Sequence, residues 1–95
     1  MCIYSWSVAE FDWNEHNEKH IQDHGLEPWE VEDAFCDPDV KTVDAYDRGG
    51  EKRWALLGAT EAGQLLFAVF TKRHGAIRVV TARPATPKDK RRYQK

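Results

Sequence analysis

The sequence predicts an α+β fold made of two N-terminal helices, a four-stranded antiparallel sheet and a short basic C-terminal helix. Helix signals lie before residue 40 and after residue 85, apolar residues recur with the period of strands between them, and short turn motifs separate the strand segments. With 95 residues, the chain is long enough for one domain and too short for two, so we expect a single domain over residues 1–95. Residues 1–10 are an N-terminal extension, in which residues 2–8 alternate weakly, as either an edge strand or an ordered tail would.

Two helices are expected before the sheet. The first runs from Asn14 to His24, and Gly25 follows in the position of a left-handed C-cap. The second begins at Pro28, because proline suits the first helical turn, and it ends at Asp37-Pro38-Asp39. Its buried stripe consists of Val31, Ala34 and Phe35.

Four strands follow, joined as an antiparallel meander. They are expected over Val40–Asp44, Lys52–Thr60, Leu65–Lys72 and Ile77–Ala82. The connections between them are Asp47-Arg48-Gly49-Gly50, Glu61-Ala62-Gly63-Gln64 and Arg73-His74-Gly75-Ala76. After the last strand, Thr86 and Pro87 followed by Asp89 have the signature of a capping box and begin the basic C-terminal helix.

The sheet is expected to have two faces that are both apolar at their centres. With a four-residue connection in each hairpin, one face carries Trp54, Leu56, Phe67 and Val69, and the other carries Ala55, Leu57, Leu66 and Phe70. Such a sheet needs cover on both sides. The two N-terminal helices cover one face, whereas the C-terminal helix offers little beyond Tyr93. The second face is therefore expected to keep apolar surface that another chain could bury.

The net charge of −2 conceals a strong polarity along the chain. Residues 1–51 include 14 acidic and three basic residues, a net charge of −11, whereas residues 52–95 include two acidic and 11 basic residues, a net charge of +9. A basic half of this kind attracts phosphate backbones or acidic protein surfaces. The alternative is that the two halves neutralise each other within the fold.

The composition disfavours membrane, exported and metal-binding proteins. The longest unbroken apolar run, Leu65–Phe70, is six residues long and too short to cross a membrane, and no export signal opens the chain. Cys2 and Cys36 lack the spacing of a metal site, so we interpret them as reduced thiols of a cytoplasmic protein. No cofactor and no metal ion is expected.

Four arginines stand at the ends of expected strands: Arg53, Arg73, Arg78 and Arg83. A guanidinium group binds phosphate through a bidentate fork and stays charged at any working pH. Neighbouring residues that would complete a phosphodiester pocket are Thr71, Thr81, His74 and Tyr93. Strict strand alternation does not place every arginine on one face, so a bulge must re-aim some of them, or fewer than four take part. The alternative is that the arginines pair with the acidic half of the chain.

The histidines give a weaker signal. His16, His20 and His24 fall four residues apart on one helix face, a spacing that can hold a metal ion. No HExxH motif is present, and we interpret all three as solvated surface residues. His74 is either a general base or a plain turn residue.

An ordered set of short motifs resembles one known family. The motifs are Phe11-Asp12-Trp13, His24-Gly25, the acidic helix Glu30–Asp33, Phe35-Cys36-Asp37-Pro38, Glu51-Lys52-Arg53, Leu57-Gly58, Phe67–Arg73, Arg78–Arg83 and Arg91-Arg92-Tyr93. Over about residues 11–93 the chain is similar to the BrnT toxins, and the succession ExR, TxR and RxxxAR is the specific part. The resemblance implies a RelE-like fold and a ribonuclease that inhibits translation in a bacterial type II toxin–antitoxin system. It also implies a BrnA-type ribbon-helix-helix antitoxin, through which alone the toxin would meet DNA.

The resemblance and the arginine positions together imply roles for individual residues in metal-independent RNA cleavage. Arg73 and Arg83 would hold the scissile phosphate, with Arg53 in support, and Glu51 would either orient Arg53 or act as the base. The residues expected to bind flanking RNA are Arg78, Thr71, His74, Lys90, Arg91, Arg92 and Tyr93. Two alternatives stay open. One is an inactive RelE-like module that only binds its protein partner, and the other is a nucleic-acid-binding regulator that acts through the basic C-terminal helix.

Overall fold

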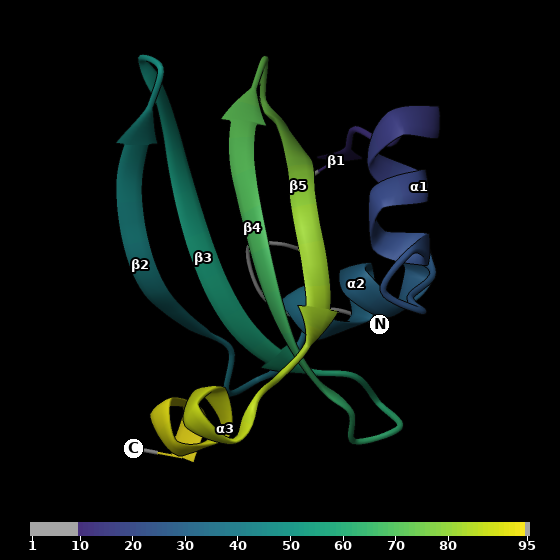
Figure 1. Cartoon of the computed structure of the whole chain (residues 1–95), viewed down its shortest axis with the longest axis vertical. Helices are drawn as coiled ribbons and strands as arrows, with labels where there is room; N and C mark the ends of the chain where they lie inside the picture. The colour runs from purple at the N-terminus through teal and green to yellow at the C-terminus, as the bar shows by residue number, and fades with distance from the viewer. Residues whose placement is uncertain (1–9, 95) are drawn as a thin grey trace.

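The computed structural model describes residues 10–94 and contains three helices and one five-stranded sheet (Figure 1). The elements in chain order are β1 (Glu10–Phe11), α1 (Glu15–Gln22), α2 (Pro28–Phe35), β2 (Lys41–Arg48), β3 (Glu51–Ala59), β4 (Leu65–Arg73), β5 (Ala76–Pro84) and α3 (Pro87–Gln94). This order confirms the predicted α+β fold. The weak alternation of residues 2–8 lies outside the described residues. Within residues 10–94, no helix is long and apolar enough to span a membrane.

The sheet has the strand order β1-β5-β4-β3-β2, and its four long strands form the predicted antiparallel meander. The two-residue strand β1, which the sequence analysis did not predict, adds a parallel pairing to β5. The strands also run further than predicted because two hairpins close in two residues each. Gly49 and Gly50 have φ values of 58° and 84°, and His74 and Gly75 have values of 49° and 80°. Positive φ at both central residues gives the turn whose twist matches that of paired strands, so Asp47, Arg48 and Arg73 belong to strands.

The helix boundaries follow the predicted capping residues. Gly25 has a φ of 79°, its N–H donates to the Gln22 carbonyl at 2.9 Å, and the N–H of Leu26 donates to the Ile21 carbonyl at 3.1 Å. These two bonds form the Schellman motif expected at a C-terminal glycine. Pro28 is the first residue of α2, and Thr86 and Asp89 exchange the two bonds of a capping box before α3. The regular part of α1 is shorter than predicted and ends at Gln22, with a turn before Gly25.

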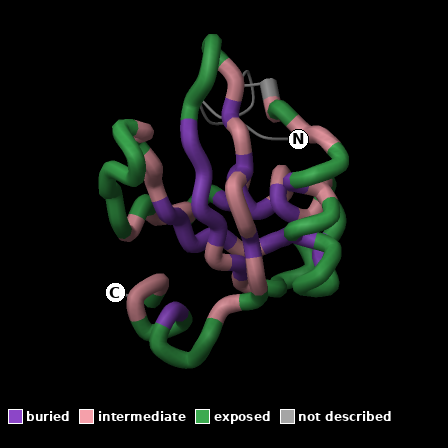
Figure 2. Tube along the Cα trace, turned by 45° about the horizontal axis from the view of Figure 1, so that its top comes forward, coloured by how far each residue is buried: buried purple, intermediate pink, exposed green. Residues whose placement is uncertain are grey.

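The main core lies between the sheet and the two N-terminal helices. Its buried members are Ile21, Leu26, Val31, Ala34, Phe35, Leu56, Leu66, Ala68, Phe70, Ile77, Val79 and Ala82. Gly58 lets α2 approach β3 closely, because a Cβ atom at this position would lie 2.2 Å from the Ala34 carbonyl oxygen. In Figure 2 the buried residues follow the middle of the strands, and the turns are exposed.

The predicted division of the sheet into faces is wrong by one residue of register. The β3–β4 connection behaves as a five-residue loop, in which the Thr60 N–H donates to the Gln64 carbonyl at 2.9 Å. Leu56 therefore lies opposite Ala68, and Leu57 lies opposite Phe67. A slip of one residue moves every side chain of a strand to the other face. Leu66 and Phe70 thus join Leu56 on the face towards the helices, here called the helix face, and Phe67 and Val69 join Leu57 on the other, the open face.

The open face is not the bare apolar surface that the sequence analysis expected. Ala55 and Leu57 are buried on it, and Val69 is 8% exposed. Phe67 is half-buried, with the Arg83 guanidinium 4.3 Å from the centre of its ring. Among the described residues, the large exposed apolar side chains are Trp29 of α2 and Tyr46 of β2. The apolar centre of this face therefore gives no sign of a missing partner.

Candidate active site

A bulge in β5 brings the four strand arginines onto the open face. Val69 pairs with Thr81, but the next residue of β4, Phe70, pairs with Val79, so Val80 is an extra residue in β5. Arg78 therefore lies opposite Thr71, and Arg83 lies opposite Phe67, on the same side of the sheet. Arg53 shares this side because it alternates with Ala55 and Leu57. This finding confirms the expectation that a bulge re-aims one of the arginines.

Three of these arginines gather at the end of the sheet where the two-residue hairpin turns lie, here called the hairpin end. Arg53, Arg73 and Arg78 line a cleft of about 190 Å³, together with Glu51 and Thr71. Helix α1 lies beside β5 (Figure 1). It supplies the rest of the polar lining through His16, Asn17 and His20. Val79 and the bulged Val80 complete the lining.

Glu51 holds two of the arginines in place. Its Oε1 atom accepts a hydrogen bond from Nε of Arg53 at 3.1 Å, and its Oε2 atom accepts two from Arg73, from Nη2 at 3.0 Å and from Nε at 3.3 Å. These hydrogen bonds, from Arg53 first and then from Arg73, hold the pKa of the Glu51 carboxyl below its ordinary value. The carboxylate is therefore ionised at neutral pH and orients both guanidinium groups.

The cleft has an excess of positive charge. Arg78 is half-buried and makes no ion pair with the residues that the structure describes. The Thr71 hydroxyl, in contrast, already has a partner, because it donates to the Lys52 carbonyl at 2.7 Å, and Thr71 is only 2% exposed. The described lining of the cleft thus contains three guanidinium groups and one carboxylate, which pairs with two of them. Such a site favours an anion with several oxygen atoms, such as a phosphodiester.

Arg83 lies at the opposite end of the sheet, next to α3, here called the α3 end. Its Nη1 atom donates to Oδ2 of Asp89 at 2.7 Å and to the Pro84 carbonyl at 3.2 Å. Arg73 lies opposite Ala76 of β5, and Ala76 is seven residues before Arg83 on that strand. At the usual rise of a strand, the two arginines are therefore roughly 20 Å apart along the sheet. Arg73 and Arg83 therefore do not reach one phosphate together in this structure. Burial opposes ionisation of Asp89, but the Thr86 amide and Arg83 outweigh it and lower the pKa of Asp89.

Two more residues expected to bind RNA have protein partners at the α3 end. Nη2 of Arg92 donates to the Val43 carbonyl at 3.0 Å and lies 3.3 Å from Oδ2 of Asp44. The Tyr93 hydroxyl donates to Oδ2 of Asp37, and burial followed by this carboxylate raises the pKa of Tyr93 well above its ordinary value. Lys90 and Arg91 are exposed and form no ion pair within residues 10–94.

Asp37 connects three parts of the chain. Besides Tyr93, its carboxylate accepts the N–H of Ala59 at 2.8 Å and the N–H of Asp39 at 2.9 Å. Burial opposes ionisation, but these three hydrogen bonds outweigh it and keep the pKa of Asp37 below its ordinary value. The Asp-Pro motif after α2 therefore ties α3 to the end of β3 and has no place in the arginine cleft.

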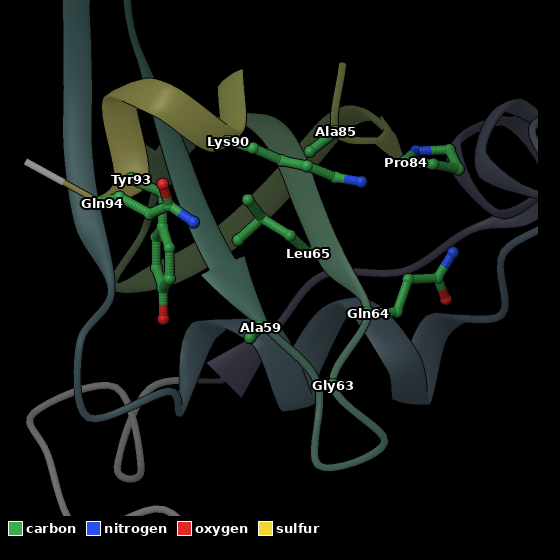
Figure 3. Close-up of a pocket in the computed structure, with 9 residues that line it drawn as sticks. All are labelled: Ala59, Gly63, Gln64, Leu65, Pro84, Ala85, Lys90, Tyr93 and Gln94. Atoms are coloured by element: carbon green, nitrogen blue, oxygen red, sulfur yellow. The ribbon is translucent and has the colours of Figure 1, made fainter. Parts of the chain in front are cut away.

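A larger pocket of about 410 Å³ lies at the α3 end (Figure 3). Lys90, Tyr93 and Gln94 of α3 face Leu65 and the β3–β4 loop across it. Among the described residues that line it, Lys90 is the one that carries a charge. Because a phosphodiester needs several donors, the smaller arginine cleft is the better candidate for the active site.

The three histidines of α1 and the turn that follows it are exposed, as expected. Two of them, His16 and His20, also line the arginine cleft. Their spacing places them on one side of α1, but the sequence carries no signal of where that side points. His74 is exposed in its turn and does not line the cleft. Within residues 10–94, no three His, Cys, Asp or Glu residues gather as metal ligands, and Cys36 is half-buried.

The chain was also compared with known proteins. A family model described as "Ribonuclease toxin, BrnT, of type II toxin-antitoxin system" matches residues 13–89. This match covers most of the chain, from the start of α1 to the first turn of α3, and includes all lining residues of the arginine cleft. The comparison with curated proteins found no match.

Proposed function

The chain belongs to the BrnT family, the ribonuclease toxins of type II toxin–antitoxin systems, and on this premise we propose that it cuts RNA in the arginine cleft and thereby stops translation. One observation carries the proposal: three guanidinium groups surround a cleft that contains a single carboxylate. The family match supports the reaction, and the charge of the cleft supports its place.

The proposed reaction uses the nucleophile that RNA itself provides. The ribose 2′-hydroxyl attacks the neighbouring phosphorus, and negative charge grows on the non-bridging phosphate oxygens. Arg53 and Arg73, which Glu51 holds in position, would bind these oxygens, and Arg78 would add a third donor. Preorganised donors of this kind stabilise a transition state without a metal ion, so the proposed reaction is metal-independent.

The remaining expected RNA-binding residues receive separate roles in the proposal. Lys90 and Arg91 are exposed and would bind flanking phosphates through charge alone. Thr71 would line the cleft and support the sheet, because its hydroxyl already donates to Lys52. We assign Arg83, Arg92 and Tyr93 to the attachment of α3, since each has a protein partner there.

The proposed partner is an antitoxin of the BrnA type, which would keep the toxin inactive in the cytoplasm. The excess of guanidinium groups would favour binding of an acidic antitoxin segment, which would compete with RNA for the cleft. The ribbon-helix-helix domain of that antitoxin, rather than this chain, would bind DNA.

Cleavage of RNA by the purified chain in the presence of EDTA tests the proposal. We expect the wild-type chain to cut a mixed-sequence single-stranded RNA, and we expect Arg73→Ala to lower the rate by about 10²–10³-fold, the usual cost of removing one preorganised donor. Arg48→Ala is the matched control, because Arg48 is exposed at a hairpin tip and does not line the cleft.

The result also decides between the proposal and its alternatives. Equal rates for Arg73→Ala and wild type would place the active site elsewhere. A wild-type chain that binds its antitoxin but cuts no RNA, in solution or in a translating extract, would be the inactive binding module.

A further inference from the structure

The proposed reaction needs two groups that the arginines do not provide. A base must accept the proton of the 2′-hydroxyl, and an acid must donate a proton to the leaving 5′-oxygen. Arginine stays protonated at any working pH and does neither at neutral pH. Among the lining residues of the cleft, the side chains able to exchange protons are Glu51, His16 and His20.

Glu51 is poorly suited to be the base. Both of its carboxylate oxygens already accept hydrogen bonds from Arg53 and Arg73. These bonds favour the ionised carboxylate and lower its pKa, which weakens it as a proton acceptor. A proton on Glu51 would also break the contacts that hold the two arginines in place.

Two other candidates are not part of the cleft lining. His74 is exposed in the β4–β5 turn and is not part of the lining. Tyr93 lies at the α3 end, where its hydroxyl donates to Asp37. His16 and His20, in contrast, line the same cleft as Arg53, Arg73 and Arg78.

We propose that His16 and His20 of α1 are the acid–base pair that cuts RNA in the arginine cleft. Both imidazoles are exposed, and both line the cleft that the arginines form. Their ring centres lie 6.3 Å apart with the ring planes at 90°. Because both rings line the same cleft at this separation, both can contact one phosphodiester that the arginines hold there.

Hydrogen bonds hold the start of α1, the helix that carries the two imidazole rings, in place. The buried Asn17 lies between them in sequence, its Nδ2 atom donates to the Asp12 carbonyl at 2.9 Å, and its Oδ1 atom accepts the Asn14 N–H at 2.7 Å. The Asn14 side chain in turn accepts the Asn17 N–H at 3.0 Å. These bonds fix the first turn of α1 without using either imidazole. His16 and His20 are therefore positioned by the helix and free to contact a substrate.

The proposed step balances protons and bonds. One neutral imidazole accepts the proton of the 2′-hydroxyl as this oxygen bonds to phosphorus. The bond from phosphorus to the 5′-oxygen breaks, and the second imidazole, in its protonated form, donates a proton to that oxygen. The products are one RNA end with a 2′,3′-cyclic phosphate and another with a 5′-hydroxyl, and the pair of histidines has exchanged its proton.

This inference rests on the proposed ribonuclease activity, and single substitutions separate the two. We expect His16→Ala and His20→Ala each to lower the cleavage rate of the mixed-sequence RNA by about 10²–10⁴-fold, the usual contribution of a general acid or base. His24→Ala is the matched control, because His24 stacks on His20 at 6.3 Å between ring centres but does not line the cleft. All three side chains are exposed, so thermal unfolding of the variants should match the wild type.

A modified substrate then identifies the acid. In an RNA whose 5′-bridging oxygen at the cleavage site is replaced by sulfur, the leaving thiolate needs no proton. We expect one of the two histidine variants to cut this RNA within about tenfold of the wild-type rate, while the other stays slow because the base is still required.

Three outcomes would overturn the inference. If both histidine variants cut ordinary RNA at the wild-type rate while Arg73→Ala is slow, the ribonuclease proposal stands and the acid–base pair lies elsewhere. If both variants are slow and neither recovers on the sulfur substrate, His16 and His20 do not act as acid and base. If the wild-type chain cuts no RNA, both proposals fail.

Discussion

The two ends of the sheet use arginine in different ways. At the hairpin end, Arg53, Arg73 and Arg78 surround one carboxylate, and the cleft keeps an excess of positive charge. At the α3 end, Arg83 pairs with Asp89, and Arg92 pairs with Asp44. A one-to-one ion pair leaves no net charge for a ligand, whereas three guanidinium groups around one carboxylate leave an excess of positive charge. The hairpin end therefore gathers an excess of positive charge in one cleft, whereas Lys90 and Arg91 at the α3 end are exposed on their helix.

The motifs that carry the family resemblance are divided between these two ends of the sheet. The Asp-Pro motif after α2 and the final tyrosine meet at the α3 end, where Asp37 accepts the Tyr93 hydroxyl. Gly58 lets α2 approach β3 there, because a side chain would strike the Ala34 carbonyl. The ExR and TxR motifs meet in the cleft through Glu51 and Arg73. A family motif thus marks either a structural contact or the site, and the end of the sheet on which it lies distinguishes the two.

The largest effect at the α3 end is expected from Asp37→Ala. This substitution removes the acceptor for Tyr93, Ala59 and Asp39 at a position that is 8% exposed. We expect the free energy of unfolding to fall by about 3 kcal/mol, since hydrogen bonds to a buried charged group are worth about 1.5–3 kcal/mol. Urea unfolding would measure the change, and Asp39→Ala, at an exposed neighbour, should change it by less than about 0.5 kcal/mol. An unchanged stability in Asp37→Ala would show that α3 is held in another way.

Arg83→Ala should show a smaller effect of the same kind. The Arg83 side chain is 34% exposed, so loss of its bond to Asp89 should lower the free energy of unfolding by only about 1 kcal/mol. The RNA cleavage rate should stay within about threefold of wild type, in contrast to Arg73→Ala. The opposite result, a rate lowered about 10²-fold with normal stability, would return Arg83 to the catalytic residues and break the division between the two ends.

The smallest expected effect is a loss of folding stability at acid pH. The pKa values of Asp37 and Asp89 are lower in the folded chain than their ordinary value of 3.8. The unfolded chain therefore binds protons first, so the stabilisation is complete above this value and is lost as the pH falls through the folded pKa values. Unfolding of wild type and Asp37→Asn, measured from pH 7 to pH 3, should show the steeper loss in wild type. Parallel curves would mean that Asp37 does not contribute.

The resemblance to the family and the strand arginines pointed to the site, yet only part of the site could be predicted. Glu51, Arg53, Arg73 and Arg78 meet in the cleft as a group, whereas Arg83 lies at the far end of its strand. Spacing along one strand does not show which residues of other strands lie beside it, because register decides that. His16 and His20 were missed as cleft residues for a similar reason, since the direction of a helix face depends on what the helix packs against.

The sequence by itself determined the three helices, the four long strands and several of the residues at which they begin or end. The residues that begin or end these elements do so through local backbone geometry, which needs no distant partner. They are Gly25, Pro28, the Thr86–Asp89 capping box and the glycines of the hairpin turns. The tertiary structure alone decided the register of β3 on β4, the bulge at Val80 and the pairing of β1 with β5. These features depend on contacts between residues far apart in the chain, and a shift of one residue changes which face each side chain occupies. The physical reason is that the geometry of a turn or a helix cap depends on a few neighbouring residues. The contact of α1 with the arginines of three strands depends instead on how the whole sheet is paired.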